Sequence, residues 1–168
     1  MASTVAYVAL GSNLDDPRAQ VAAGMNELAA LPGTELEARS SLYESEPMGP
    51  QDQPDYVNAV VRLRTALSPE ALLGSLQTIE QRHGRQRTRH WGARTLDLDI
   101  LLYGELQIAG PRLQIPHPGI AVRSFVLYPL AELDSQLDIP GLGSVAELLA
   151  ACPMGRLVRL DMAARSIV

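Results

Sequence analysis

The chain contains no lysine, so all 14 of its basic side chains are arginines. It has one cysteine, Cys152, which excludes an internal disulfide and is typical of a reducing compartment. Its apolar runs, such as the strand-sized stretch at 100–103, are too short for a membrane span. No basic region precedes the first apolar stretch, so no secretory signal is predicted. We therefore expect a cytoplasmic protein that does not enter membranes.

Several common functional motifs are also missing. The absence of G-x-x-x-x-G-K-[ST] excludes a Walker-type nucleotide site, and no G-x-G-x-x-G follows the first apolar stretch, which disfavours a Rossmann domain. Ser12 lies in G-S-N rather than in the G-x-S-x-G of serine hydrolases. A net charge of −5 and an aromatic content of 4% argue against a general nucleic-acid binder.

The order of the expected elements predicts an α+β fold. Apolar patterns predict strands at 4–12, 34–45, 56–65 and 97–103, with helices between the first two and the last two. This order is the ferredoxin-like β-α-β-β-α-β unit, with a mainly antiparallel sheet and helices packed on it. A hairpin near 106–116, a helical segment after Pro118 and a helix at about 144–151 extend it. The length of 168 residues favours one domain over 1–168.

Two aspartates interrupt the apolar strand expected at 97–103. Asp97 and Asp99 are two residues apart, so both side chains point to one face of a strand. We expect the strand to be buried, where an unpaired carboxylate is costly, so a cation should lie beside it. One interpretation is a pair of Mg²⁺ ions, because the Cα atoms should lie about 6.5–7 Å apart and oxygen ligands without thiols suit Mg²⁺. The alternative is that both aspartates pair with arginines.

Arginines cluster just before this strand. A GC-rich coding bias explains the absence of lysine but not this clustering. Because the guanidinium group suits phosphate oxygens, the cluster favours a polyanion site in a mobile loop at 84–95 that orders over its ligand. Five arginines lie within 13 residues, together with two histidines: Arg82, Arg85, Arg87, Arg89 and Arg94, with His83 and His90.

Aromatic and amide side chains suggest a site for a flat heterocycle. Tyr56 and Asn58 share one strand face, where a ring can stack on a ligand and an amide can bond to its edge. The alternative is that Tyr56 belongs to the core or its rim. His117 lies between two prolines, upstream of Arg123 and Phe125, the only phenylalanine. This segment is either a ligand-contacting loop or a structural one.

Four short sequences stand in one order along the chain: ALGSNL at 9–14, GPQDQPDYVNA at 49–59, HWGARTLDLDIL at 90–101, and IPHP with RSFVLYPL within 115–130. Together they closely resemble the 6-hydroxymethyl-7,8-dihydropterin pyrophosphokinase family of folate biosynthesis. The similarity covers about residues 4 to 135. It implies transfer of pyrophosphate from ATP to the hydroxymethyl oxygen of the pterin, with release of AMP.

The resemblance also implies a set of site residues. Catalysis would fall to Arg85, Arg94, Asp97 and Asp99, with two Mg²⁺ ions on the aspartates. The pterin would stack between Tyr56 and Phe125, within a set of Gly11, Ser45, Glu46, Pro47, Met48, Tyr56, Asn58, Trp91 and Phe125. ATP would contact Gln77, Glu80, Arg87, Trp91, Ile100, Arg112, His117 and Arg123. Its small-molecule partners would be ATP and the pterin, with no nucleic acid or membrane, and we expect a monomer.

The chain departs from the family pattern in a few places. Glu46 stands where proline is common, and the segment from Gly84 to Trp91 is one residue short, which leaves open whether Arg87 or Arg89 meets phosphate. Two other functions use some of the same residues. A nucleotide- or RNA-binding module would need a basic, aromatic sheet face, and a Mg²⁺-dependent nucleotide hydrolase would share the aspartates without using Tyr56, Asn58 and Phe125.

Overall fold

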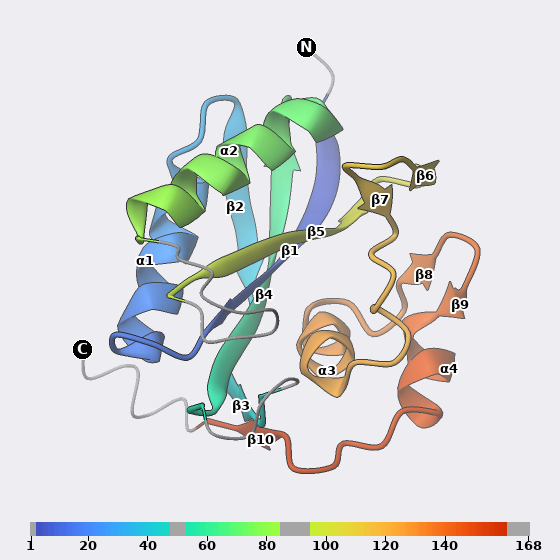
Figure 1. The fold of residues 1–168 in the computed structure, drawn as a ribbon. Coiled ribbons are helices and arrows are strands. Elements are labelled where there is room, and N and C mark those ends of the chain that lie inside the picture. The colour runs from blue at the N-terminus through green and yellow to red at the C-terminus, as the bar shows by residue number, and fades with distance from the viewer. Residues whose placement is uncertain (1–2, 48–52, 85–94, 161–168) are drawn as a thin grey trace.

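A six-stranded antiparallel sheet forms the middle of the computed structural model, which describes residues 3–47, 53–84 and 95–160 (Figure 1). Its strands are β1 (Thr4–Ser12), β2 (Thr34–Arg39), β3 (Tyr43–Ser45), β4 (Tyr56–Thr65), β5 (Asp97–Tyr103) and β10 (Val158–Arg159). The helices are α1 (Pro17–Ala29), α2 (Pro69–Arg82), α3 (Ser124–Leu133) and α4 (Val145–Ala150). Two small hairpins pair β6 (Ile108–Ala109) with β7 (Gln114–Ile115) and β8 (Asp138–Ile139) with β9 (Gly143–Ser144).

The strand order confirms the ferredoxin-like prediction. The sheet runs β10-β3-β4-β1-β5, with β2 also paired to β4, so β1 is central and β5 lies at an edge. Figure 1 shows α1 and α2 on one face of the sheet and α3 on the other. The expected helix starts are present, because Asp16 accepts a hydrogen bond from the Ala19 N–H and Ser68 accepts one from Ala71.

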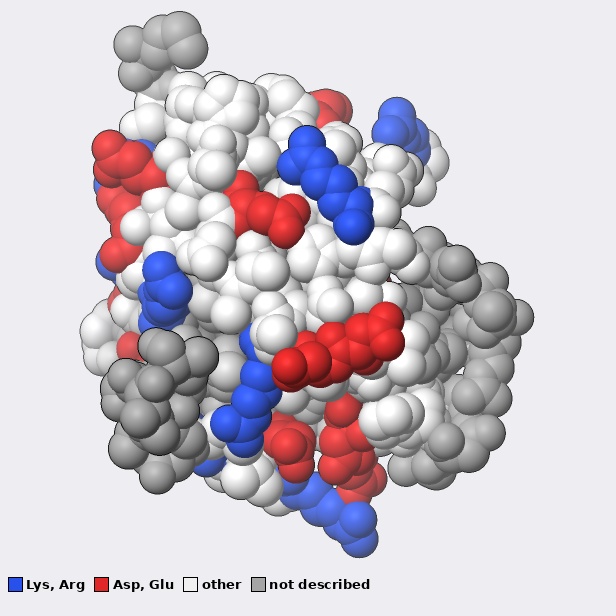
Figure 2. Space-filling model, turned by 90° about the vertical axis from the view of Figure 1, so that its left-hand side faces the viewer, with Lys and Arg blue, Asp and Glu red and all other residues white. Residues whose placement is uncertain are grey.

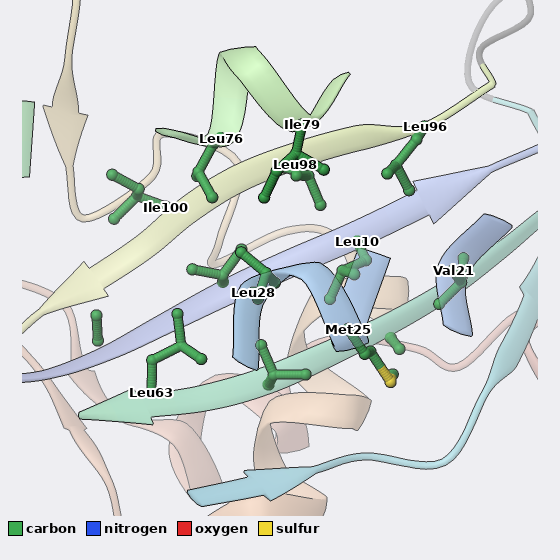
Figure 3. Close-up of a cluster of buried hydrophobic side chains, with 14 of the residues drawn as sticks. Leu10, Val21, Met25, Leu28, Leu63, Leu76, Ile79, Leu96, Leu98 and Ile100 are labelled. Carbon is green, nitrogen blue, oxygen red and sulfur yellow. The ribbon is translucent and has the colours of Figure 1, made fainter. Parts of the chain in front are cut away.

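The main hydrophobic core lies between the sheet and helices α1 and α2. Figure 3 shows Leu10 of β1, Met25 and Leu28 of α1 and Leu98 of β5 in this cluster. A second cluster lies on the opposite face, where Tyr7, Val60 and Leu101 pack with residues of α3. Both faces of the central strands are therefore covered, and alternate residues of one strand serve different clusters.

The strand predicted at 34–45 is two strands. Both β2 and β3 pair with β4, but the register shifts by one residue between Leu36 and Ala38 and again before Tyr43. Between them, the Ser40 N–H donates to the Val60 carbonyl at 2.9 Å, while the Val60 N–H donates to the Ser40 hydroxyl at 2.9 Å instead of to a backbone carbonyl. These irregularities bend the chain away from the first part of the strand, as bulges do.

The C-terminal third contains more order than expected. The predicted hairpin, α3 and α4 are present, and Ser144 caps α4 by accepting a hydrogen bond from the Glu147 N–H. The hairpin β8–β9 and the strand β10 were not predicted. Among the described residues, the longest helix is α2 with 14 residues, and none is long and apolar enough to span a bilayer.

Candidate active site

Three neighbouring strands place Asn58, Gly11 and Asp97 in one row on the α3 side of the sheet. Asn58 of β4 pairs with Gly11 of β1, and Gly11 pairs in turn with Asp97 of β5. Adjacent strands lie about 4.7–4.9 Å apart, so the Cα atoms of Asn58 and Asp97 are roughly 9.5 Å apart across β1. Gly11 adds no side chain to the floor between them, which is bordered by the Tyr56 ring, 3.6 Å from a Cβ built on Gly11. We call this row the Gly11 trough, and its shape suits a flat ligand.

The amide oxygen of Asn58, rather than its nitrogen, faces the trough. Its Nδ2 donates to the Ser45 hydroxyl at 2.7 Å and lies 3.4 Å from the Tyr43 carbonyl oxygen. A Cβ built on Gly11 would lie 3.4 Å from Asn58 Oδ1, so this oxygen borders the trough. The side chain is buried and fixed by its donors, and its acceptor is directed towards the place where a ligand edge with N–H groups would lie.

The two aspartates of β5 share a face, as predicted. They alternate with Leu96, Leu98 and Ile100, which point into the core under α2 (Figure 3). The expectation of buried carboxylates was wrong: Asp97 is half-buried and Asp99 is exposed, because the cluster under α3 that buries Leu101 on the same face of β5 does not extend over them. Burial alone therefore does not require a cation here. The exposed Asp99 is accessible to a ligand from solution.

Glu80 of α2 is the buried carboxylate of this region. Only 4% of its surface is exposed, and it accepts a hydrogen bond from the Leu98 N–H at 2.8 Å. Leu98 lies between Asp97 and Asp99 on the edge strand. The bond from α2 therefore fixes the backbone that carries both aspartates. Sequence reasoning placed Glu80 beside ATP, and the structure shows in addition this bond to β5.

The charges of Asp99 and Arg123 both act on the His117 ring. The Gly119 N–H donates to His117 Nδ1 at 3.0 Å, so the proton of the neutral ring is on Nε2. Burial lowers the pKa of His117 below its ordinary value, Asp99 partly opposes this shift, and Arg123 adds to it. The Arg123 guanidinium carbon lies 6.0 Å from the centre of the Phe125 ring, within cation–π range. A neutral imidazole, a guanidinium and an aromatic ring thus flank the aspartate side of the site.

An anchor for Gln53 and Pro54, which precede β4, was missed from the sequence. The Asn13 amide donates to Gln53 Oε1 at 3.0 Å and to the Pro54 carbonyl at 2.9 Å. Asn13 and Gln53 are both buried. The bonds hold the approach to β4 against the end of β1, beside the trough. The signal available in the sequence was Asn13, an amide side chain directly after Gly11-Ser12 at the end of a strand.

The other predicted residues fall in different places. Gln77 and Arg112 are exposed, on α2 and in the β6–β7 hairpin, and Ile100 directs its side chain into the core. Tyr56 and Phe125 are half-buried. The predictions for Met48, Arg85, Arg87, Arg89, Trp91 and Arg94, and for a mobile 84–95 loop, fall on or within stretches outside the described residues.

A groove lies beside the trough and includes C-terminal residues that had no predicted role. Its volume is about 490 Å³, within the usual range for small-molecule sites. It is lined by Ser45, Glu46 and Phe125, which the resemblance assigns to the pterin. The segment 153–157 also lines the groove. Nothing in the local sequence of that segment indicated a place in the site.

On the face drawn in Figure 2, the charges of the described residues do not form one basic field. Figure 2 shows the face on the left-hand side of Figure 1, where acidic and basic side chains are interspersed among the residues drawn in colour. An interspersed pattern does not favour a nucleic-acid backbone, which needs a contiguous positive surface.

Comparisons with known proteins agree with the sequence motifs. Residues 7–135 match the family model described as 7,8-dihydro-6-hydroxymethylpterin-pyrophosphokinase (HPPK). A Pseudomonas aeruginosa protein named 2-amino-4-hydroxy-6-hydroxymethyldihydropteridine pyrophosphokinase is 53% identical over 92% of this chain and 95% of its own length. The Haemophilus influenzae protein of that name is 49% identical over 93% and 98% of the two chains.

A solved structure supports the fold. The Plasmodium falciparum HPPK-DHPS triple mutant with pteroate superposes with a TM-score of 0.71 at 14% identity. The match covers 89% of this chain but 41% of the Plasmodium chain, so the present chain spans less than half of that protein. At this identity the likeness shows the fold alone.

Proposed function

Since the chain belongs to the 7,8-dihydro-6-hydroxymethylpterin-pyrophosphokinase family, we propose that it transfers pyrophosphate from ATP to 6-hydroxymethyl-7,8-dihydropterin in folate biosynthesis. The Gly11 trough is the observation that carries this proposal. It offers an amide acceptor at one end, the Gly11 floor in the middle and two carboxylates at the other end. A flat pterin lying there with its N–H edge towards Asn58 would direct its hydroxymethyl group towards Asp97.

The reaction needs an in-line attack on the middle phosphate of ATP. The hydroxymethyl oxygen of the pterin forms a bond to the β-phosphorus, and the bond from that phosphorus to the oxygen bridging the α- and β-phosphates breaks. AMP leaves with the electron pair of that bond, and the hydroxyl proton passes to water. The protein's work is to position the two substrates and to stabilise charge on the phosphate oxygens.

Asp97 and Asp99 fit a magnesium site. Among the described residues, no cluster of three or more His, Cys, Asp or Glu side chains is suited to holding a metal. A pair of carboxylates on one strand face nevertheless suits Mg²⁺, which keeps several waters and takes other ligands from substrate phosphates. When bound, Mg²⁺ would neutralise developing charge on the transferred group. We propose two such ions.

Two kinds of residue are proposed to contact ATP: those placed near Asp99 and the arginines of the family motif. His117 and Arg123 lie near Asp99, where neutral Nε2–H and guanidinium donors suit phosphate or ribose oxygens. Arg123 also lies over the Phe125 ring, which holds the cation next to the pterin position. Arg85, Arg87 and Arg94 join them in the proposal on the strength of the family motif.

The test is an AMP-release assay with ATP, Mg²⁺ and the hydroxymethyl pterin. AMP should form only when all three are present. AMP or ADP formed at the same rate without the pterin would instead show a nucleotide hydrolase. We also propose that the enzyme is a cytoplasmic monomer, which size-exclusion chromatography with light scattering and fractionation of cells would test.

A further inference from the structure

The groove adjoins the Gly11 trough at Ser45. Ser45 and Phe125 line the groove, and the Ser45 hydroxyl accepts the hydrogen bond from Asn58 that fixes the acceptor of the trough. Pro153, Met154, Gly155, Arg156 and Leu157 also line the groove. We call these five residues, 153–157, the C-terminal strap. A ligand in the trough that extends past Ser45 therefore meets the strap.

The strap is fixed at both of its ends. Before it, the Cys152 carbonyl accepts a hydrogen bond from the Tyr128 hydroxyl of α3 at 3.0 Å. After it, β10 pairs with β3, and the Leu160 N–H donates to the Leu42 carbonyl at 2.9 Å. Leu157 is 6% exposed and serves as an apolar anchor. Held in this way, the strap is a wall of defined position rather than a loose tail.

A second tie holds β10 against α3. Arg159 of β10 donates through Nε to the Ser41 hydroxyl at 3.1 Å, and its guanidinium lies 3.4 Å from Glu132. Glu132 also accepts hydrogen bonds from the Ser41 N–H and from the Tyr43 hydroxyl. One polar cluster thus connects three elements. They are β3, which carries Ser45, α3, which carries Phe125 in its first turn, and β10, which follows the strap.

We propose that the C-terminal strap is the outer wall of the pterin site and that Met154 and Arg156 determine which substituted pterins bind. This proposal rests on the proposed function. Met154 is 39% exposed and lines the groove with its flexible thioether chain, which adapts to the outline of an aromatic bicycle. Substituents on the far side of the bicycle meet this side chain.

Arg156 acts through Glu46. The two side chains form an ion pair at 2.6 Å across the mouth of the groove, joining the strap to the segment after β3. The Glu46 carboxylate is thereby held on the rim, where it can accept hydrogen bonds from amino and ring N–H groups of a pterin. Arg156 is 85% exposed, so the pair is weak and its effect is on position rather than on stability.

The test measures binding of 6-hydroxymethylpterin by calorimetry, with Mg²⁺ and a non-hydrolysable ATP analogue present. Met154→Trp should fill the groove and raise the pterin Kd at least tenfold, while the Kd of the ATP analogue changes less than twofold. The matched control is Val158→Trp, which adds the same ring at a position that is 53% exposed and outside the groove. The control should leave both constants unchanged.

Two more variants test specificity and position. Met154→Ala should improve binding of a pterin carrying an added methyl group relative to the unsubstituted pterin, when compared with the wild type. Arg156→Ala should raise the pterin Kd by up to about fivefold at low salt, the range of an exposed ion pair, and the effect should fade as salt is added. Arg64→Ala, which removes an equal charge from the exposed side of β4, should have no effect.

The outcomes separate this proposal from the proposed function. If the wild type binds pterin and Met154→Trp binds it within twofold of the wild type, the strap is not part of the site, although the function stands. An unchanged Kd for Arg156→Ala at low salt removes the role given to the ion pair. If the wild type does not bind the pterin at all, both proposals fall.

Discussion

Replacing Glu80 with alanine is expected to destabilise the edge strand that carries the two aspartates. Glu80 is 4% exposed, and its carboxylate accepts the buried Leu98 N–H at 2.8 Å. Alanine leaves this donor without its acceptor, away from water. A buried donor left unsatisfied costs about 1–3 kcal/mol, and the lost side-chain volume adds to it. We expect the free energy of unfolding to fall by roughly 2–3 kcal/mol.

Urea denaturation followed by circular dichroism measures this loss. Gln77→Ala is the matched control, because it lies one turn earlier on α2 and is exposed. Glu80→Gln retains a carbonyl oxygen that can accept the Leu98 N–H, so it should recover a large part of the stability. A Glu80→Ala unfolding free energy within about 0.5 kcal/mol of the Gln77→Ala value, the range of ordinary surface substitutions, would show that the Glu80–Leu98 hydrogen bond does not stabilise β5.

The same substitution should act on catalysis through position. With β5 less constrained, Asp97 and Asp99 hold the metal in a poorer geometry, so the Mg²⁺ concentration for half-maximal rate should rise and kcat should fall. Glu80→Gln should rescue both. If Glu80→Ala loses stability but keeps the wild-type Mg²⁺ dependence, the carboxylate supports the fold only and does not position the aspartates.

Three other outcomes are expected. Asp97→Asn and Asp99→Asn should each abolish AMP formation while the urea midpoint changes little, because neither carboxylate is buried; near-normal turnover would exclude the metal role. Gly11→Val should raise the pterin Kd at least tenfold by filling the floor beside Asn58, with little change in the Kd of ATP; unchanged pterin binding in calorimetry would show that the ligand lies elsewhere. Burial, together with the hydrogen bond to the Glu132 carboxylate, raises the pKa of Tyr43 above its ordinary 10.0. The contribution of this shift to the free energy of unfolding is therefore fully present below pH 10 and is lost as the pH rises above that value. Tyr43→Phe should therefore flatten the alkaline fall in unfolding free energy, and an unchanged slope would contradict this origin.

The regular elements were predictable because local patterns specify them. Apolar periodicity and the caps at Asp16 and Ser68 gave both long helices, and strand alternation placed Asp97 and Asp99 on one face. The prediction that both aspartates are buried was wrong. Alternation says which residues share a face, but exposure depends on whether another element covers it, and the cluster under α3 does not extend over Asp97 and Asp99.

The features missed from the sequence depend on contacts between distant residues. The Gly11 trough requires the registers of β4 and β5 against β1, which periodicity does not specify. The C-terminal strap is held by a two-residue strand, β10, which is too short to carry a pattern of its own. The division of 34–45 into two strands arises from bulges opposite β4. Tertiary pairing decides all three.

Phosphorus NMR of one completed reaction tests directly whether the enzyme transfers pyrophosphate from ATP to the pterin. The enzyme is mixed with equal amounts of ATP and 6-hydroxymethyl-7,8-dihydropterin in the presence of Mg²⁺, and the products are identified from their phosphorus resonances. The account predicts equal amounts of AMP and a pterin diphosphate, because attack at the β-phosphorus moves two phosphates together. ADP with a pterin monophosphate, or free pyrophosphate with unmodified pterin, would contradict it.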